Sequence, residues 1–352
     1  MSKKISQNNS RNEPLLEITN LTIDFDTADG WVRGLHGVNL KVANGEILGL
    51  VGESGSGKSI TCMAITRLLG PRALLQGEIR YRNRSLLNLE PKEYNQIRGN
   101  EIAMIFQEPM SSLNPIQTIG RQIVESVGLN PQRSVGTQLS KVVQHYRKIS
   151  GQAAWKESVR LLNRVGIPGS EQRMHDYPHQ LSGGMNQRTM IAMALAGRPS
   201  LLIADEPTTA LDVTIQAQIL DLIRQLRDEM DMAIILITHD LGVVAETCDR
   251  VAVMYAGRIV EQGPVAAVFE TPHHPYTRGL LESLPRIDTG NNKLHPIQGT
   301  VPAPHELSCG CAFEPRCNFT IENCALMPPP PGTIVQQRSH ACFNPQKARL
   351  EI

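Results

Sequence analysis

The sequence lacks long hydrophobic runs, an excess of charge of either sign and much of the usual aromatic content. No stretch approaches the roughly 20 apolar residues that span a bilayer, and the best runs, such as residues 232–237, have the length of a strand. The 35 basic and 34 acidic side chains leave a formal charge of +1, which does not suggest the clustered basic surface that binds nucleic acid. The composition therefore indicates a soluble or peripheral protein and argues against acidic polymers as partners.

The start of the chain has no apolar core. Residues 1–14 are polar and carry Lys3 and Lys4, so they do not resemble a secretory signal peptide. We expect them to form a short disordered tail. The length of 352 residues is enough for two or three compact units with a substantial core.

Two kinds of strand pattern occur along the chain. Residues 15–25 and 37–42 roughly alternate between apolar and polar side chains, which predicts half-buried strands of an antiparallel sheet. Other short runs are almost continuously apolar and are separated by segments with helical spacing, which is typical of a mostly parallel sheet in an α/β fold. These buried strands are expected at residues 46–51, 102–106, 201–204 and 233–238.

Strand signals are missing between Gln107 and Ser182. Helical spacing at residues 119–127 and 155–165, joined by a polar link near 130–151, predicts a helical insert. Beyond Gly263 the chain is rich in proline, histidine and cysteine, which indicates a separate C-terminal region. We therefore expect a tail at 1–14, an α/β domain at 15–263 with a helical subdomain at about 108–181, and a C-terminal region at 264–352.

A complete phosphate-binding pattern, G-x-x-x-x-G-K-[ST], lies between a predicted strand and a predicted helix at residues 52–59, here named the phosphate loop. Its backbone N–H groups would surround phosphates, Lys58 would reach the β- and γ-phosphates and Ser59 would hold Mg²⁺. A glycine-rich turn without function is a poor alternative in this context. The residues expected to contact the nucleotide here are Gly52, Ser54, Gly55, Ser56, Gly57, Lys58, Ser59 and Ile60.

A second loop with related chemistry is the Leu-Ser-Gly-Gly run at residues 181–184, here named the signature loop. It presents a hydroxyl, bare backbone N–H groups and the positive end of a helix dipole, all of which suit a terminal phosphate. The phosphate loop already holds the phosphates of one nucleotide. The simplest arrangement is therefore that Ser182, Gly183 and Gly184 reach a nucleotide held by another chain.

An apolar strand ends in the carboxylates of Asp205 and Glu206. Asp205 could support Mg²⁺ opposite the phosphate loop, and Glu206 could polarise an attacking water. A pair of carboxylates at a strand end is more often a helix cap or a solvated edge, and Pro207 is compatible with such a cap. Only the order of these residues relative to the other loops favours the functional interpretation.

Two further polar residues follow predicted strands. His239 should emerge at the carboxyl edge where open parallel sheets bind ligands, and a neutral imidazole there could contact a γ-phosphate or hold water near Glu206. Gln107 could ligate Mg²⁺ or orient water. Each residue alone is more often structural or a surface residue, so both gain weight only as members of a set.

Taken in order, these motifs resemble the nucleotide-binding subunit of ABC transporters over about residues 15–263. The resemblance implies a P-loop ATPase fold and a head-to-tail dimer with two ATP molecules at its interface, each bound by the phosphate loop of one subunit and the signature loop of the other. It assigns ATP and Mg²⁺ to Lys58 and Ser59, metal binding and γ-phosphate sensing to Gln107, and metal support to Asp205. It makes Glu206 the general base, Asp212 the residue that communicates across the dimer, and His239 the switch.

The match to the family is incomplete at two places. Met185 follows the signature glycines where the family usually has glutamine, which removes a polar contact and leaves the Ser-Gly-Gly donors. The family also stacks an aromatic ring on adenine upstream of the phosphate loop. Trp31 and Phe25 are both candidates, and spacing does not decide between them.

Several motifs narrow the resemblance to the oligopeptide and dipeptide permease ATPases of the peptide and nickel importer branch. In that branch a C-terminal segment carries four cysteines, which correspond here to Cys311, Cys317, Cys324 and Cys342. The other motifs are FQEPMSSLNP from 106, YPH from 177, SGGM from 182, ADEPTTALDVT from 204 and HPYT from 274.

Three interpretations compete for the four cysteines. Disulfides are disfavoured in the reducing cytoplasm, and structural zinc usually takes more closely spaced cysteine pairs. Four thiolates suit a [4Fe–4S] cluster, which the resemblance implies and which spacing alone would not select. Cys309 lies outside the family pattern, and Cys62 and Cys248 are expected to be small buried apolar residues.

The resemblance implies an ATPase that powers peptide import from the cytoplasmic face of the inner membrane, as a peripheral subunit. The expected partners are a second homologous ATPase, two transmembrane permease subunits and, indirectly, an extracytoplasmic peptide-binding protein; no nucleic acid is expected. The sequence leaves open which peptides are carried and whether the dimer pairs identical chains. The alternatives are a soluble ABC ATPase of DNA repair or translation, and a C-terminal redox sensor that regulates the ATPase.

Overall fold

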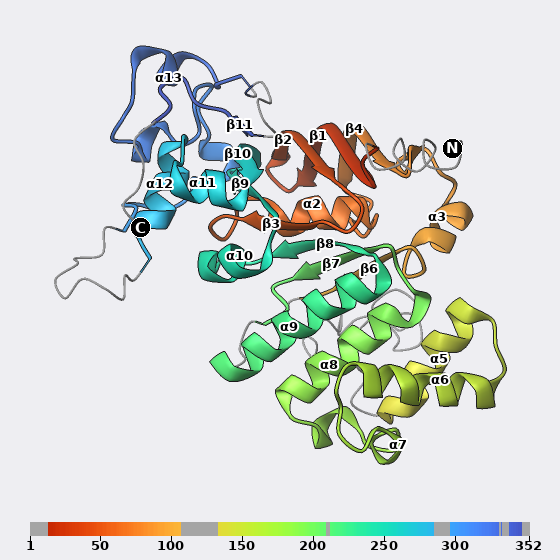
Figure 1. Ribbon diagram of the computed structural model, residues 1–352. Coiled ribbons are helices and arrows are strands. Elements are labelled where there is room, and N and C mark those ends of the chain that lie inside the picture. The colour runs from red at the N-terminus through yellow and green to blue at the C-terminus, as the bar shows by residue number, and fades with distance from the viewer. Residues whose placement is uncertain are drawn as a thin grey trace, which may run out of the picture. The chain divides into compact units, whose positions relative to one another are not determined.

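The computed structural model describes residues 13–106, 133–208, 212–284, 296–330, 332 and 338–346. The chain divides into two compact units (Figure 1). The first contains Met1–Asn88 and Leu236–Ile352, and the second contains Leu89–Ile235. The expected tail up to residue 12, the expected helix at 119–127 and Gln107 lie outside the described residues.

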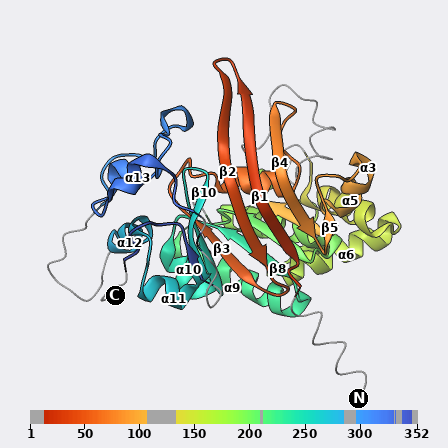
Figure 2. The same cartoon turned by 90° about the horizontal axis from the view of Figure 1, so that it is seen from above.

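The first unit contains an antiparallel sheet, as the alternating pattern predicts. Its strand order is β2-β1-β4-β5, and a register shift in β1 near Asn20 moves the buried face from Leu16 and Ile18 to Leu21 and Ile23. Figure 2 shows β1, β2 and β4 side by side. The strands are β1 (Leu16–Thr27), β2 (Gly30–Val42), β4 (Ala73–Tyr81) and β5 (Arg84–Ser85).

The other strands of the first unit surround the start of the phosphate loop. β3 (Ile47–Val51) is fully buried and pairs in parallel with β9 (Arg250–Tyr255). β9 pairs antiparallel with β10 (Arg258–Pro264), which pairs with the short β11 (Ser339–His340) from the C-terminal segment. The helices of this unit are α2 (Lys58–Ile65), α10 (Leu241–Thr247), α11 (Val265–Glu270), α12 (Pro275–Glu282), α13 (Glu322–Leu326) and the 3₁₀ turns η3 (Pro304–Glu306) and η4 (Glu314–Arg316).

Residues of the C-terminal segment share one buried core with these strands. Tyr276 and Phe313 belong to the same apolar cluster as Val51, Val253 and Tyr255. Their burial removes apolar surface from water and attaches the C-terminal segment to the strand that leads into the phosphate loop.

The second unit combines a parallel strand pair with helices. β6 (Ile102–Ile105) and β7 (Leu201–Asp205) pair in parallel, and β8 (Ala233–Ile237) follows β7 in the strand order, as the continuous apolar runs predict. Within described residues 133–182 there is no strand, and the elements there are helices and 3₁₀ turns. The helices are α3 (Pro91–Ile97), α5 (Val135–Arg147), α6 (Gly151–Arg164), α7 (Ser170–Arg173), α8 (Gly183–Ala194), α9 (Val213–Met230) and the turns η1 (Pro178–Gln180) and η2 (Leu195–Gly197).

The polar link expected near residues 130–151 is wrong, because α5 occupies most of it. Val135, Leu139 and Val143 recur every four residues and are buried, and Ser134 caps the helix at its start. α5 and α6 lie side by side (Figure 1), and Ser140 Oγ is 3.3 Å from Ser158 Oγ between them. In the described part of the chain, no helix is long and apolar enough to cross a lipid bilayer.

Candidate functional site

The phosphate loop connects β3 to α2, as its motif requires. Gly52 has φ of 150°, and a Cβ at this position would lie 2.1 Å from the carbonyl oxygen of Met254. Gly57 caps α2 with φ of 103°, and a Cβ there would lie 2.8 Å from Leu35 Cδ2. Both positions therefore require glycine for conformational and steric reasons.

Lys58 lies at the first turn of α2 with only 7% of its surface exposed. Its ammonium donates to the carbonyl oxygens of Gly52 (2.8 Å) and Glu53 (2.9 Å) and to Ser56 Oγ (3.4 Å). Loop backbone thus holds a positive charge at the start of a helix, where anions are favoured.

The middle of the loop is open to solvent. Ser54 and Gly55 are exposed, whereas Ser56 is buried and Ser59 and Ile60 are half-buried in the first turn of α2. A buried cation beside exposed backbone N–H groups has the chemistry needed to bind a polyphosphate. The predicted loop residues are therefore brought together in a form that fits ATP.

The signature loop opens α8 in the second unit. Ser182 is the N-cap, and its Oγ accepts a hydrogen bond from the backbone N–H of Met185 (3.3 Å). Ser182 and Gly183 are exposed, while Gly184 packs so closely that a Cβ would lie 2.7 Å from Ile215 Cγ2. The exposed helix start leaves the hydroxyl and the backbone of this loop accessible to a ligand.

The carboxylates at the end of β7 have different surroundings. Asp205 is the last residue of the strand and is 6% exposed, whereas Glu206 is half-buried. Glu206 has φ of 46°, a left-handed conformation that costs a residue with a side chain about 1–3 kcal/mol. Eight other described residues with side chains, such as Arg67 and Arg198, also have a positive φ, so this conformation agrees with a functional role but does not single out Glu206.

Asp212 and His239 lie next to helix starts. Asp212 is the N-cap of α9, and its Oδ1 accepts from the N–H of Ile215 (2.9 Å). His239 is exposed between β8 and α10, whose start is capped by Asp240. Asp212 forms this cap within its own segment of the chain. A carboxylate directly before a long helix is a sequence signal that could have predicted the cap.

The two aromatic candidates occupy different parts of the β1–β2 hairpin. Trp31 lies at its end and is 63% exposed. Phe25 lies over Gly34, since a Cβ on that glycine would be 2.8 Å from the Phe25 ring. Gly34 closely approaches Gly257, whose N–H donates to the carbonyl oxygen of Ser56 in the phosphate loop (2.8 Å).

All seven cysteines are free thiols, so the structure contradicts the disulfide alternative. Burial is the main cause that raises the pKa of Cys311, Cys317 and Cys342, the last to about 11, and neighbouring thiols contribute to each shift. The backbone N–H of Cys311 donates to the carbonyl oxygen of Cys324 (2.7 Å), and this hydrogen bond joins the turn at Cys311 to α13. Among the described residues, no group of three or more His, Cys, Asp or Glu side chains is arranged to hold a metal ion.

A contact that the sequence analysis missed joins the C-terminal segment to the phosphate loop. Arg316 forms a bidentate ion pair with Glu53, with N–O distances of 2.7 and 3.1 Å. The N–H of Glu53 donates to the Tyr276 hydroxyl (2.9 Å). The His-Pro-Tyr-Thr motif contains Tyr276, and Arg316 directly precedes Cys317, but nothing local in either segment indicates Glu53 as the partner.

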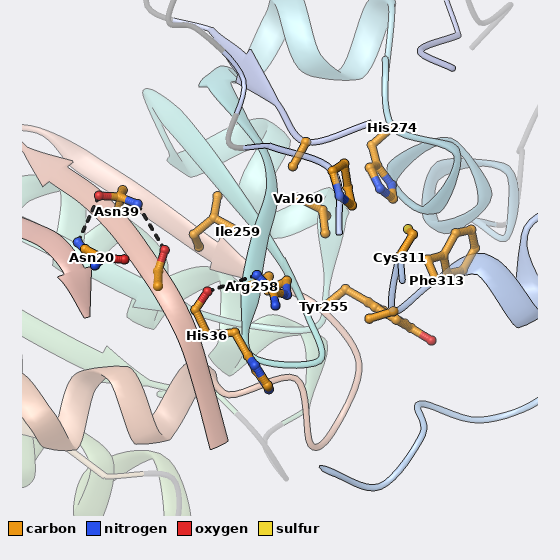
Figure 3. A pocket seen from close by; sticks show the side chains of 14 residues that line it. Asn20, His36, Asn39, Tyr255, Arg258, Ile259, Val260, His274, Cys311 and Phe313 are labelled. Atoms are coloured by element: carbon orange, nitrogen blue, oxygen red, sulfur yellow. Dashed lines mark hydrogen bonds between the residues drawn. The ribbon is translucent and has the colours of Figure 1, made fainter. Parts of the chain in front are cut away.

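A cavity of about 180 Å³ in the first unit has Asn20 and Asn39 at one end and Cys311 and Phe313 at the other (Figure 3). His36 also lines it, and His36 Nε2 is buried without a hydrogen-bond partner. Burial, and secondarily the charge of nearby arginines, lowers the pKa of His36 to about 4. The imidazole is therefore neutral at physiological pH.

Two family models match the chain. The ABC transporter model matches residues 35–209, and the model of the oligopeptide/dipeptide transporter C-terminal region matches residues 260–324. The first match contains both the phosphate loop and the signature loop. The second contains Tyr276, Arg316 and three of the four cysteines expected to act together.

Relatives with assigned names match over almost the whole chain. The oligopeptide transport ATP-binding protein OppD of Salmonella typhimurium is 46% identical over 340 residues, covering 96% of this chain and 95% of its own. The OppD protein of Haemophilus influenzae is 47% identical over 315 residues, covering 90% and 93%. A solved ATP-binding cassette, a dimer in a post-hydrolysis state with ADP and phosphate, matches with a TM-score of 0.59 and 27% identity, covering 71% of this chain and 98% of its own.

Proposed function

The chain belongs to the ABC transporter family, and from this premise we propose that it hydrolyses ATP to power peptide import through a membrane transporter. The main support is the buried Lys58 within a complete phosphate loop, in a chain 46–47% identical to oligopeptide transport ATP-binding proteins over nearly its whole length. The names of these relatives do not favour the alternative of a soluble ATPase in DNA repair or translation.

ATP fits the phosphate loop, because the loop offers exposed backbone N–H groups beside a fixed ammonium. On binding, Lys58 would exchange loop carbonyls for β- and γ-phosphate oxygens. Ser59, Gln107 and Asp205 are the proposed Mg²⁺ ligands, and the ion would neutralise charge on the phosphates. The residues proposed for phosphate binding are Gly52, Ser54, Gly55, Ser56, Gly57 and Ile60 in addition to Lys58 and Ser59.

Hydrolysis requires a water held in line with the γ-phosphate. Glu206 is the proposed general base, and it lies half-buried directly after β7. His239 is proposed to contact the γ-phosphate and Gln107 to sense it. Catalysis then rests mainly on positioning and charge stabilisation.

The exposed signature loop is proposed to bind the ATP of a second, homologous ATPase subunit. Ser182, Gly183 and Gly184 would donate to its γ-phosphate, and Asp212 would connect this contact to the dimer interface. The same second chain would offer its own signature loop to the ATP on Lys58. The complex would also contain two transmembrane permease subunits and receive peptide from an extracytoplasmic binding protein, with this chain at the cytoplasmic face of the inner membrane.

Adenine is proposed to stack on an aromatic residue of the β1–β2 hairpin. Trp31 is the more exposed ring, whereas the chain of contacts from Phe25 through Gly34 and Gly257 leads to the phosphate loop. Loss of a stacked ring weakens base binding by about 1–3 kcal/mol, so Trp31→Ala and Phe25→Ala are expected to separate the two in an ATP titration. The substitution that leaves ATP affinity unchanged identifies the ring that does not stack.

We propose that Cys311, Cys317, Cys324 and Cys342 hold a [4Fe–4S] cluster, which would require these thiols to move closer together than they lie in this structure. Their thiols lie near enough to influence one another, and the N–H of Phe319 donates to Cys317 Sγ (3.4 Å), a contact that tunes such centres. A cluster would supply a covalent link between these segments. Anaerobic purification with iron, sulfide and zinc analysis tests this: about four irons, lost in Cys324→Ser and kept in Cys309→Ser, supports the cluster, whereas zinc or bare thiols refutes it.

Replacement of Glu206 by Gln tests the proposed function. Glu206→Gln is expected to retain ATP binding and lose ATP hydrolysis and peptide uptake by the reconstituted complex, because the amide cannot accept a proton from water. Glu246→Gln, on α10, is the control for a surface carboxylate. Normal hydrolysis in Glu206→Gln would refute the assignment of the base.

A further inference from the structure

We infer that Arg316 is a positioning residue for the phosphate loop and acts on bound ATP through Glu53. This inference rests on the proposed function, since it takes residues 52–59 as the ATP site. Arg316 lies 263 positions downstream of Glu53, in a turn of the C-terminal segment. The C-terminal segment thus contributes to the geometry of the nucleotide site as well as to its own fold.

Every N–H donor of Arg316 has an acceptor. Nη1 donates to Glu53 Oε2 (2.7 Å) and the Tyr255 hydroxyl (3.3 Å), and Nη2 donates to Glu53 Oε1 (3.1 Å) and Gly299 O (3.2 Å). Nε donates to Gln298 O (2.8 Å). The Arg316 side chain is only 6% exposed, so its direction is fixed, whereas the Glu53 side chain is 29% exposed and its carboxylate remains in contact with solvent.

A second contact holds Glu53 from its backbone. Its N–H donates to the hydroxyl of Tyr276, a fully buried residue whose ring packs against Tyr255 and Phe313 at centroid distances of 4.6 and 5.3 Å. Arg316 also lies over the Tyr255 ring at 5.7 Å. Glu53 is therefore fixed at its carboxylate and at its amide by residues outside the phosphate loop.

Fixing Glu53 also fixes the carbonyls that hold the loop together. The carbonyl oxygen of Glu53 accepts from Lys58 Nζ (2.9 Å) and from the N–H of Ser56 (3.2 Å). The preceding residue is Gly52, whose backbone lies so close to Met254 that there is no space for a Cβ. A displaced Glu53 would consequently change the conformation of the loop and the position of the Lys58 ammonium before ATP binds, when Lys58 exchanges these carbonyls for phosphate oxygens.

The ion pair has an electrostatic role in addition. Glu53 places a carboxylate within a loop that must accept a polyanion, and a bare carboxylate there would oppose ATP. Arg316 neutralises it in a fixed bidentate geometry, which lysine cannot reproduce because its donors lie on a single atom. Glu53 can thus serve as an anchor for the loop without repelling the nucleotide.

The test compares ATP affinity in four forms of the full chain: wild type, Arg316→Ala, Glu53→Gln and the double variant. Affinity is measured with a fluorescent ATP analogue, and KM and kcat are measured in the reconstituted complex. Arg316→Ala is expected to weaken ATP binding by about tenfold, with kcat at saturating ATP nearly unchanged, because it leaves the Glu53 carboxylate uncompensated beside the ATP site and loosens the loop before chemistry. The double variant is expected to recover only part of the loss, since it removes the uncompensated carboxylate but still lacks the anchor that positions the loop.

A matched control separates loop positioning from general stability. Arg338 pairs with the fully buried Glu261 (2.8 Å) and also attaches the C-terminal segment, but its hydrogen bonds go to Glu261 and Thr271, which lie outside the phosphate loop. Arg338→Ala is expected to lower the melting temperature and leave ATP affinity within about twofold of wild type. Should Arg316→Ala fail to fold, Arg316→Lys with and without Glu53→Gln gives the same comparison with a smaller loss.

Unchanged ATP affinity in Arg316→Ala, or complete recovery of affinity in the double variant, overturns the inference that Arg316 positions the loop. Lys58→Ala distinguishes this failure from failure of the proposed function. Loss of ATP binding in Lys58→Ala with normal binding in Arg316→Ala overturns only the role of Arg316. Normal ATP binding in Lys58→Ala overturns the ATP site itself, and with it both proposals.

Discussion

His274 is expected to make the stability of the chain depend on pH. It is 1% exposed, and its Nδ1 accepts from the N–H of Tyr276 (3.1 Å) at the start of α12. Burial, with a smaller effect from His340, lowers the pKa of His274 to about 3 from its usual 6.5. Glu261 faces the same segment, with its carboxylate accepting from the His274 backbone N–H (2.9 Å) and paired with Arg338.

The direction in which stability changes with pH depends on whether the folded or the unfolded state binds the proton. Below pH 6.5 the unfolded chain protonates this histidine while the folded chain does not. The free energy of unfolding is therefore at its full value above about pH 6.5 and decreases progressively as the pH falls toward 3. Between pH 7 and pH 5 the loss in unfolding free energy is about 2 kcal/mol. Protonation at lower pH would also remove the acceptor that caps α12.

Urea unfolding of wild type and His274→Asn at pH 7 and pH 5, followed by circular dichroism, measures this loss. Asparagine keeps a capping oxygen and does not titrate, so the drop in unfolding free energy between the two pH values is expected to be about 2 kcal/mol smaller in the variant. His145→Asn, at an exposed position of α5, is the control. Equal drops in wild type and His274→Asn would refute the reasoning.

Three other substitutions test the nucleotide site and its helices. Gly52→Ala is expected to abolish ATP binding, because its Cβ would lie 2.1 Å from a backbone oxygen; wild-type binding in a nucleotide titration would contradict this. Asp212→Ala is expected to destabilise α9 by about 1 kcal/mol in urea unfolding, because it removes the helix cap. Asp212→Asn keeps the cap, so it is expected to retain stability and lose only ATPase activity if the charge of the residue acts across the dimer. Ser182→Ala is expected to lower hydrolysis by the assembled dimer and leave ATP binding to the isolated chain unchanged, so weakened binding there would contradict a role toward the partner's nucleotide.

The parts of the fold with strong local patterns could be predicted from the sequence. The strands leading to the phosphate loop and to Asp205 are continuous apolar runs, and both are fully buried strands. α5 was missed because its apolar residues occupy only one face, among many polar ones, and packing against α6 completes it. The strand at residues 250–255 was not predicted, although it pairs directly with β3.

The candidate site also has parts that the sequence predicts and parts that it does not. The loop motif predicted a phosphate cradle, and the glycines and Lys58 adopt the required conformation. The left-handed backbone of Glu206 has no sequence signal, because a glutamate rarely adopts it. The pairing of Glu53 with Arg316 joins residues that only tertiary structure brings together, and no local pattern in either segment specifies the other.

The distance along the chain between Glu53 and its two anchors has a consequence for synthesis. The phosphate loop emerges from the ribosome long before Tyr276 and Arg316, which lie 223 and 263 residues later. A nascent chain that already contains the whole loop therefore still carries an unpaired Glu53 carboxylate. On the role inferred for Arg316, tight ATP binding develops only after the C-terminal segment has folded. A chain that ends before Arg316 is therefore expected to bind ATP weakly.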